Sequence, residues 1–185
     1  MESVNPKLIV ILLGVIALFV YLKVTNPHQK YSTSKYWESA TIDDVADIPD
    51  DALLPGNKNS PVLMWAASTT DNPEIITALI NRGVDVNERE VDFKGTALSA
   101  AAYRNPDPAI IDILVEHGAH VNIVLGRLKK TPLLLAAEQN DLSVTERLIS
   151  HGADVTYSDV NGKTAPMLAI EFENKEVAEF YGREH

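Results

Sequence analysis

From about residue 60 onward, apolar residues recur three and four positions apart, a spacing typical of amphipathic helices. The clearest segments carry Ile75, Ile76, Leu79 and Ile80; then Ile110, Ile111, Leu114 and Val115; then Val144, Leu148 and Ile149. A glycine follows each segment, at Gly83, Gly118 and Gly152. Glycine takes the left-handed conformation that commonly ends a helix, so the pattern predicts three helices that each stop just before a glycine.

A second apolar pattern shares the same period. The strings PVLMWAA, TALSAAA, TPLLLAA and TAPMLAI begin at Pro61, Thr96, Thr131 and Thr164, which are 35, 35 and 33 residues apart. Threonine is a good N-cap, and small alanines let neighbouring helices approach closely. A fixed period in the thirties indicates stacked units that are each too small to bury their own apolar face. The sequence therefore predicts an all-α solenoid of helix-turn-helix units.

These strings resemble the ankyrin repeat. TPLLLAA matches the first helix of that family, LISHGADV the end of the second helix, and DVNGKT the hairpin loop. The resemblance implies a capping half-repeat at 37–59, repeats at 60–94, 95–130 and 131–163, and a shortened C-terminal repeat at 164–185, with projecting hairpin loops. The chain departs from the family where Val62, Ala97 and Ala165 replace the usual proline, and where loop 123–130 lacks the usual turn residues.

The N-terminal segment differs in character from the repeats. Residues 8–22 form an uncharged run of 15, LIVILLGVIALFVYL, between Lys7 and Lys23. A helix of that length covers about 22 Å, whereas a bilayer core is about 30 Å thick, so Val24 and both lysine stems would be needed to span it. We expect one transmembrane helix within residues 1–24, crossing the membrane at 8–24, with a cleaved signal peptide as the alternative. Residues 25–36 are polar and predict a flexible tether.

Two opposing considerations bear on the side of the membrane where the repeats lie. Lys23, Lys30 and Lys35 after the run favour a cytoplasmic C-terminal part. An apolar segment at the extreme N-terminus, by contrast, usually directs export of the chain that is C-terminal to it. By resemblance to small anchored bacterial repeat proteins, we expect a single-pass protein of the bacterial inner membrane with its repeat domain facing the periplasm.

Charge and composition narrow the function classes. The net charge is −10 with a pI near 4.9, which disfavours nucleic acid as a ligand and favours a basic protein partner. The chain has no cysteine, and the loops contain no phosphate-binding, HExxH or GxSxG motif. His117 and His151 occupy equivalent positions of stacked units, about 10 Å apart, too far to share one zinc ion. We expect no catalytic residues, metal site, cofactor or small-molecule substrate, and no enzyme activity.

Binding is the remaining function, and the resemblance implies two surfaces for it. We define the first-helix surface as the exposed pair that follows each small doublet: Ser68, Thr69, Tyr103, Arg104, Glu138, Gln139, Glu171 and Phe172. We define the loop-tip surface as Phe93, Lys94, Arg127, Tyr157 and Asn161. Tyrosine and arginine often dominate binding energy, which singles out Tyr103 and Arg104. For residues 123–125, contact with a partner and packing under the loop are both open.

The sequence thus predicts a membrane-tethered protein–protein interaction module. A plausible specific role is an immunity or inhibitor protein that occludes a toxin. The alternative is a non-inhibitory envelope adaptor that supports a stress-response or redox enzyme.

Overall fold

The computed structural model describes residues 28–54 and 61–183. The chain divides into two units, Met1–Lys30 and Tyr31–His185, and the repeats lie in the second. The expected membrane-spanning segment, residues 8–24, lies outside the described residues. Within the described ranges, each helix is too short or too polar to cross a bilayer.

The first helix of each repeat begins where the sequence predicts it. These helices are α4 (Val62–Thr69), α6 (Ala97–Arg104), α8 (Pro132–Gln139) and α10 (Ala165–Glu171). The Thr96 and Thr131 hydroxyls accept hydrogen bonds from the backbone N–H of the third residue of their helices, which satisfies donors that the helix leaves free. The paired alanines of α4, α6 and α8 are completely buried, so these helices pack closely.

The second helices are α5 (Pro73–Asn81), α7 (Pro108–Glu116), α9 (Leu142–Ser150) and α11 (Lys175–Arg183). The first three of them carry the predicted apolar stripes. Helix α7 begins after the Asp107 cap with Pro108, and its buried residues are Ile110, Ile111 and Leu114. The chain leaves this helix through Gly118, whose φ of 91° lies in the left-handed region. The predicted stop signal is therefore confirmed at this position.

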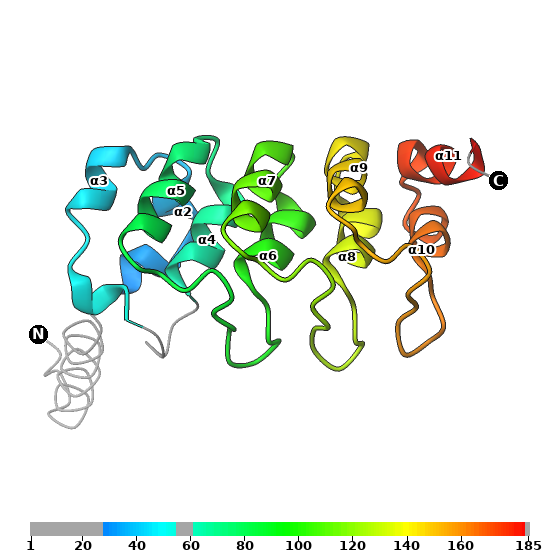
Figure 1. Cartoon of the computed structure of the whole chain (residues 1–185), viewed down its shortest axis with the longest axis horizontal. Coiled ribbons are helices and arrows are strands. Elements are labelled where there is room, and N and C mark those ends of the chain that lie inside the picture. The colour runs from blue at the N-terminus through cyan, green and yellow to red at the C-terminus, as the bar shows by residue number, and fades with distance from the viewer. Residues whose placement is uncertain (1–27, 55–60, 184–185) are drawn as a thin grey trace, which may run out of the picture. The chain divides into compact units, whose positions relative to one another are not determined.

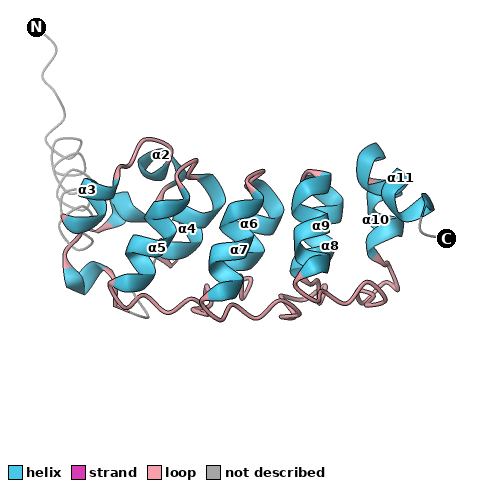
Figure 2. Cartoon of the chain, turned by 45° about the horizontal axis from the view of Figure 1, so that its top comes forward, coloured by secondary structure: helices cyan, strands magenta, loops and turns pink. Residues whose placement is uncertain are grey.

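Two layers of helices result from stacking these pairs. Helices α4, α6, α8 and α10 pack on one another in one layer, and α5, α7, α9 and α11 pack in the other. Figure 1 shows the loops projecting together from one side of the stack, and Figure 2 shows the same order of helix pairs from another direction. Across residues 28–54 and 61–183 there is no β-strand, and the predicted all-α repeat fold is confirmed.

The N-terminal cap begins earlier than predicted. It contains a 3₁₀ helix at Gln29–Ser32, α2 (Ser34–Trp37), α3 (Ile42–Ala46) and a 3₁₀ helix at Asp50–Ala52. Helix α2 packs against α4 and α3 against α5, so the cap extends both layers.

Residues 31–36, which we assigned to the polar tether, belong to this folded cap. Tyr31 and Trp37 are buried, and the Trp37 indole N–H donates to the Tyr31 carbonyl at 2.8 Å. The Tyr31 and Tyr36 rings meet edge to face at 5.2 Å, and burial together with nearby acidic groups raises the pKa of Tyr36 to about 12. The tether prediction was wrong here because the apolar faces of two tyrosines outweigh the surrounding serines and lysines.

Buried asparagines tie each repeat to the one before it. The Asn140 side-chain amide donates to the carbonyl oxygens of Ala102 and Asn105, both at 2.9 Å. Asn105 makes the same type of contact with Ala67 and Thr70, one repeat earlier. These bonds satisfy carbonyls at the C-terminal ends of the first helices, which would otherwise be buried without donors.

A second set of asparagines joins the loops to the neighbouring repeat. The Asn87 amide donates to the Gly118 carbonyl at 2.9 Å, and its oxygen accepts from the His120 N–H at 3.0 Å. Asn122 repeats this arrangement with Gly152 and Asp154. The spacing between successive loops is therefore fixed by paired hydrogen bonds.

Candidate functional site

The predicted loop-tip surface is built on three hairpin-like loops that precede α6, α8 and α10. The Glu90 N–H donates to the Gly95 carbonyl at 2.8 Å in the first loop, and the Leu125 N–H donates to the Lys130 carbonyl at 2.9 Å in the second. The second loop closes although it lacks the usual turn residues, because Gly126 and Lys129 both adopt positive φ. Each loop thus holds its tip at a defined position beside the first helices.

A hollow of about 910 Å³ lies between the first two loops and helices α4, α6 and α8. Its lining is mainly apolar and includes Met64, Phe93, Tyr103, Leu128 and Leu135. Phe93 is 79% exposed and Leu128 48%, an unusual degree of exposure for such large apolar side chains. Apolar hollows with a few polar groups at their edge are the usual form of a binding site.

The structure brings three of the predicted site residues together in this hollow. Phe93 comes from the first loop, Arg127 from the second and Tyr103 from α6. Lys94 lies between Phe93 and Gly95, which both line the hollow, and it is exposed with a φ of 58°.

A second, smaller hollow of about 400 Å³ lies at the opposite ends of the first helices. Three more predicted residues, Ser68, Thr69 and Arg104, line it. Tyr103 lines the large hollow, and the next residue, Arg104, lines the small one. The pair singled out in the sequence therefore contributes to both hollows from the last turn of α6.

Other predicted residues make contacts within the fold. Glu138 is buried, unlike the exposed position that we expected, because its carboxylate forms an ion pair with Lys130. The Tyr157 hydroxyl donates to the Lys129 carbonyl at 2.9 Å and so links the second and third loops. Ser68 is also buried, with its hydroxyl donating to the Trp65 carbonyl.

The C-terminal part of the predicted surface lies away from both hollows. Gln139, Asn161 and Phe172 are among its residues, and all three are exposed. Glu171 is exposed and forms an ion pair with Lys163 at 2.9 Å. Of the three residues for which two interpretations were open, Ile123 and Leu125 are buried under the loop, whereas Val124 is 39% exposed.

Several residues of the large hollow were not predicted. Counted from Pro61, Thr96 and Thr131, Met64 and Ser99 occupy the fourth position, and Ala100 and Leu135 the fifth. Helical spacing offered a signal, since Ser99 and Ala100 lie one turn before Tyr103 on the same side of α6. The sequence alone did not show that these positions face the loops.

The third loop is held by a carboxylate. Burial would raise the pKa of Asp159, but its hydrogen bonds from the Lys163 and Asn161 backbone N–H groups and the charge of Lys130 outweigh burial and lower that pKa. The two N–H donors lie 2.9 and 2.8 Å from the Asp159 carboxylate. The ionised carboxylate therefore replaces the backbone partners that this tight turn lacks.

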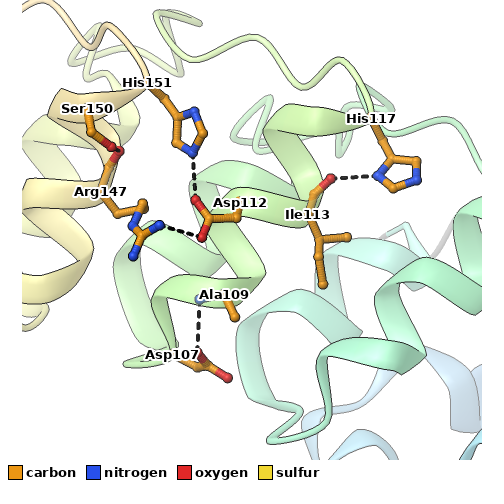
Figure 3. Close-up of polar contacts among 8 residues, drawn as sticks. All are labelled: Asp107, Ala109, Asp112, Ile113, His117, Arg147, Ser150 and His151. Carbon is orange, nitrogen blue, oxygen red and sulfur yellow. Dashed lines mark hydrogen bonds and ion pairs between the residues drawn. The ribbon is translucent and has the colours of Figure 1, made fainter.

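One polar cluster on the second-helix layer contains residue types used in catalysis. Asp112 accepts from Arg147 at 2.7 Å and from the His151 Nε2 at 2.6 Å (Figure 3). Ser150 is adjacent in sequence, but its hydroxyl donates to the Arg147 carbonyl at 2.7 Å, and it does not bond to the imidazole. A serine needs a neighbouring base to become nucleophilic, so these contacts join α9 to α7 without forming a proton relay.

His117 holds the equivalent place one repeat earlier. Its Nδ1 lies 2.7 Å from the Ile113 carbonyl oxygen (Figure 3). Because a carbonyl oxygen can only accept, Nδ1 is the donor, and the ring adds a second donor to a carbonyl that already accepts from the His117 N–H at 3.1 Å.

Comparison with known proteins supports the repeat assignment. Residues 98–180 match a family model described as ankyrin repeats in three copies, and residues 59–90 match one described as an ankyrin repeat. Together the two matches cover more than half of the chain.

Curated relatives match about half of this chain. The chain is 38% identical over 93 residues to Ankyrin repeat and SOCS box protein 6 of Mus musculus, which covers 50% of this chain and 22% of that protein. It is 31% identical over 102 residues to putative palmitoyltransferase ZDHHC13 of Danio rerio, covering 55% of this chain and 16% of that protein. It is 30% identical over 104 residues to glycerophosphocholine phosphodiesterase GDE1 of Candida albicans, covering 55% and 9%. The chain thus spans less than a quarter of the length of each of these relatives.

Proposed function

This chain belongs to the ankyrin-repeat family, whose arrays are protein–protein interaction modules, and we propose that it binds one partner protein through its first helices and loop tips. The observation that carries this proposal is the apolar hollow of about 910 Å³ on that surface. Its exposed Phe93 and Tyr103 offer large rigid side chains of the kind that dominate binding energy. We propose binding without catalysis, although two relatives carry enzyme names, because the similarity to them is confined to part of their length.

We further propose that residues 8–24 tether this module to a membrane. The support is the unbroken apolar run of residues 8–22 between two lysines. In this proposal the repeats of a bacterial inner-membrane protein face the periplasm. Extraction of membranes with alkaline carbonate tests the tether, since a spanning helix stays in the pellet. Reporter fusions placed after residue 54 test the orientation.

Inhibition of a toxin is the specific role that we propose for binding. An acidic chain attracts a basic target over distance, and a module that covers a surface can block access to it. The alternative is an adaptor for a stress-response or redox enzyme. Adding the purified full chain to the identified partner distinguishes these roles, because an inhibitor abolishes the activity of the partner and an adaptor leaves or raises it.

Site-specific photocrosslinking in cells tests the binding surface. A crosslinking amino acid in place of Tyr103 is expected to capture one protein, whereas the same amino acid in place of exposed Glu146 on α9 is expected to capture none. Equal capture at both positions would mean that the first-helix surface is not where the partner binds.

A further inference from the structure

The charges around the two hollows are arranged with opposite sign, and this arrangement constrains the partner. At the large hollow, the Lys130 ammonium is neutralised by Glu138, which leaves Arg127 and Asp92 as the other charged groups of its lining. Lys94 and Lys129 stand in the same two loops, and both are exposed. The second loop, residues 123–130, therefore keeps a net positive charge, although the whole chain carries −10 and the first loop also holds Glu88 and Glu90.

The small hollow has the reverse balance. Its lining contains Glu38, Asp71 and Asp107 against the single cation Arg104. The C-terminal ends of α4 and α6 and the N-terminal end of α7 all lie here, so their dipoles oppose one another and the side chains decide the balance. A cation is thus favoured at this end of the surface and a carboxylate beside the second loop.

Local charges decide which segment of a partner fits here. At physiological salt, charges are screened beyond about 8 Å, so the net charge of the chain steers a partner from a distance but does not select contacts within the hollows. The area between the charged ends is apolar, with Phe93 and Tyr103 exposed above it.

We infer that the two hollows together bind an extended segment of the partner protein that carries three features in order. An acidic residue lies toward Arg127, a large apolar side chain fills the large hollow, and a basic residue enters the small hollow beside Asp71. This inference rests on the proposed function, since it names the chemistry of the segment that the same surface takes. The two ends of opposite sign fix the direction in which the segment lies.

Selection from a random peptide library displayed on phage, with the full chain immobilised, tests this inference. We expect the selected peptides to be enriched in an acidic residue, a large apolar residue and a basic residue in a constant order. Synthetic peptides of the selected sequences are then titrated against the full chain, each beside a version in which the acidic and basic residues are exchanged. The exchanged peptides are expected to bind at least about fivefold more weakly.

Variants of the protein locate the binding. Phe93→Ala is expected to weaken binding by about tenfold or more, as truncation of a central aromatic side chain usually does. Arg127→Glu and Asp71→Lys are each expected to weaken the binding of the selected peptides by about fivefold. Each is also expected to restore part of the affinity for the peptides with exchanged charges. Val91→Ala in the same loop as Phe93 and Glu176→Lys on α11 are matched controls, and both positions are exposed and outside the two hollows.

The outcomes separate the inference from the proposed function. If the peptides need Phe93 but tolerate both charge reversals, or if no peptide is enriched, the inference about the segment is overturned while binding of a partner by this surface still stands. If the selected peptides bind equally well to Phe93→Ala and Tyr103→Ala, both the inference and the proposed binding surface are overturned.

Discussion

Replacing Asn140 with alanine is expected to destabilise the repeat stack at the junction of α6 and α8. The side chain is 7% exposed, and its amide nitrogen lies 3.2, 2.9 and 2.9 Å from the carbonyl oxygens of Ala101, Ala102 and Asn105. Two N–H groups are shared among these three acceptors. In Asn140→Ala the Ala102 and Asn105 carbonyls lose these donors in a buried site, whereas the Ala101 carbonyl still accepts from the Asn105 N–H at 2.9 Å.

The magnitude can be worked from the cost of unsatisfied buried groups. A buried acceptor left without a partner costs about 1–3 kcal/mol, and two N–H donors are lost, so we expect the free energy of unfolding to fall by about 2–4 kcal/mol. This is a large share of the total, because domains of this size are stable by about 5–15 kcal/mol. Since stacked repeats are stabilised mainly through their interfaces, the loss is expected to weaken the coupling between the second and third repeats.

Urea unfolding of the full chain, followed by helical circular dichroism, measures this change. Asn140→Asp is the sharper variant, because it keeps the shape of the side chain and replaces the donor with an acceptor that repels the three carbonyls. Asn81→Ala is the control, since Asn81 is exposed on α5. If Asn140→Asp unfolds at the same urea concentration as the wild type, the donor role assigned to this side chain is wrong.

Local geometry gives three other predictions. Gly118→Ala is expected to lower the free energy of unfolding by about 1 kcal/mol because φ is 91°, although the added Cβ meets nothing within 4 Å. Gly182→Ala in α11 is expected to raise the free energy of unfolding by about 0.5 kcal/mol, because alanine restricts the unfolded chain more than glycine does. If urea unfolding shows that the two glycine substitutions change this free energy in the same direction, the backbone argument is wrong. Asp112→Ala removes the ion pair with Arg147 and the hydrogen bond with His151, and is expected to lower the free energy of unfolding by about 1 kcal/mol in the same assay. An unchanged free energy of unfolding would show that these partly exposed contacts do not stabilise the fold. Because the pKa of Asp159 is lowered, its ionised carboxylate stabilises the fold above the ordinary carboxyl pKa of about 3.9, and this stability is lost as pH falls through the lower pKa of the folded chain. The Lys163 amide resonance should therefore titrate below about pH 3.9 and not at it.

The order and ends of the repeat helices were predictable because they depend on neighbours along the chain. Thr131 caps the helix that begins at Pro132, and an amide of the first turn is within reach of any threonine placed there. Gly118 ends α7 because its own backbone must adopt positive φ. The start and the end of each helix therefore depend only on residues a few positions apart in the chain.

The predicted cap and surface were less accurate because they depend on contacts between distant parts of the chain. Composition placed Tyr36 in a tether, but its ring is held by Tyr31 and Trp37 in a cluster that forms only when α2 packs on α4. Glu138 fits an exposed position by register, yet Lys130 at the base of the second loop reaches it and Glu138 becomes buried. Burial of this kind depends on where the loop lies and not on the period of the repeat.

The sequence by itself determined the helix pairs, their period and the turns between them, since those features are set by capping, helical spacing and glycine conformation. The tertiary structure decided which side chains share a surface. Phe93, Tyr103 and Arg127 lie in separate parts of the chain and line one hollow only because stacking sets loops from two repeats beside α6. The opposite charges of the two hollows are likewise a consequence of packing, because ion pairing removes some charges and the helix ends gather others.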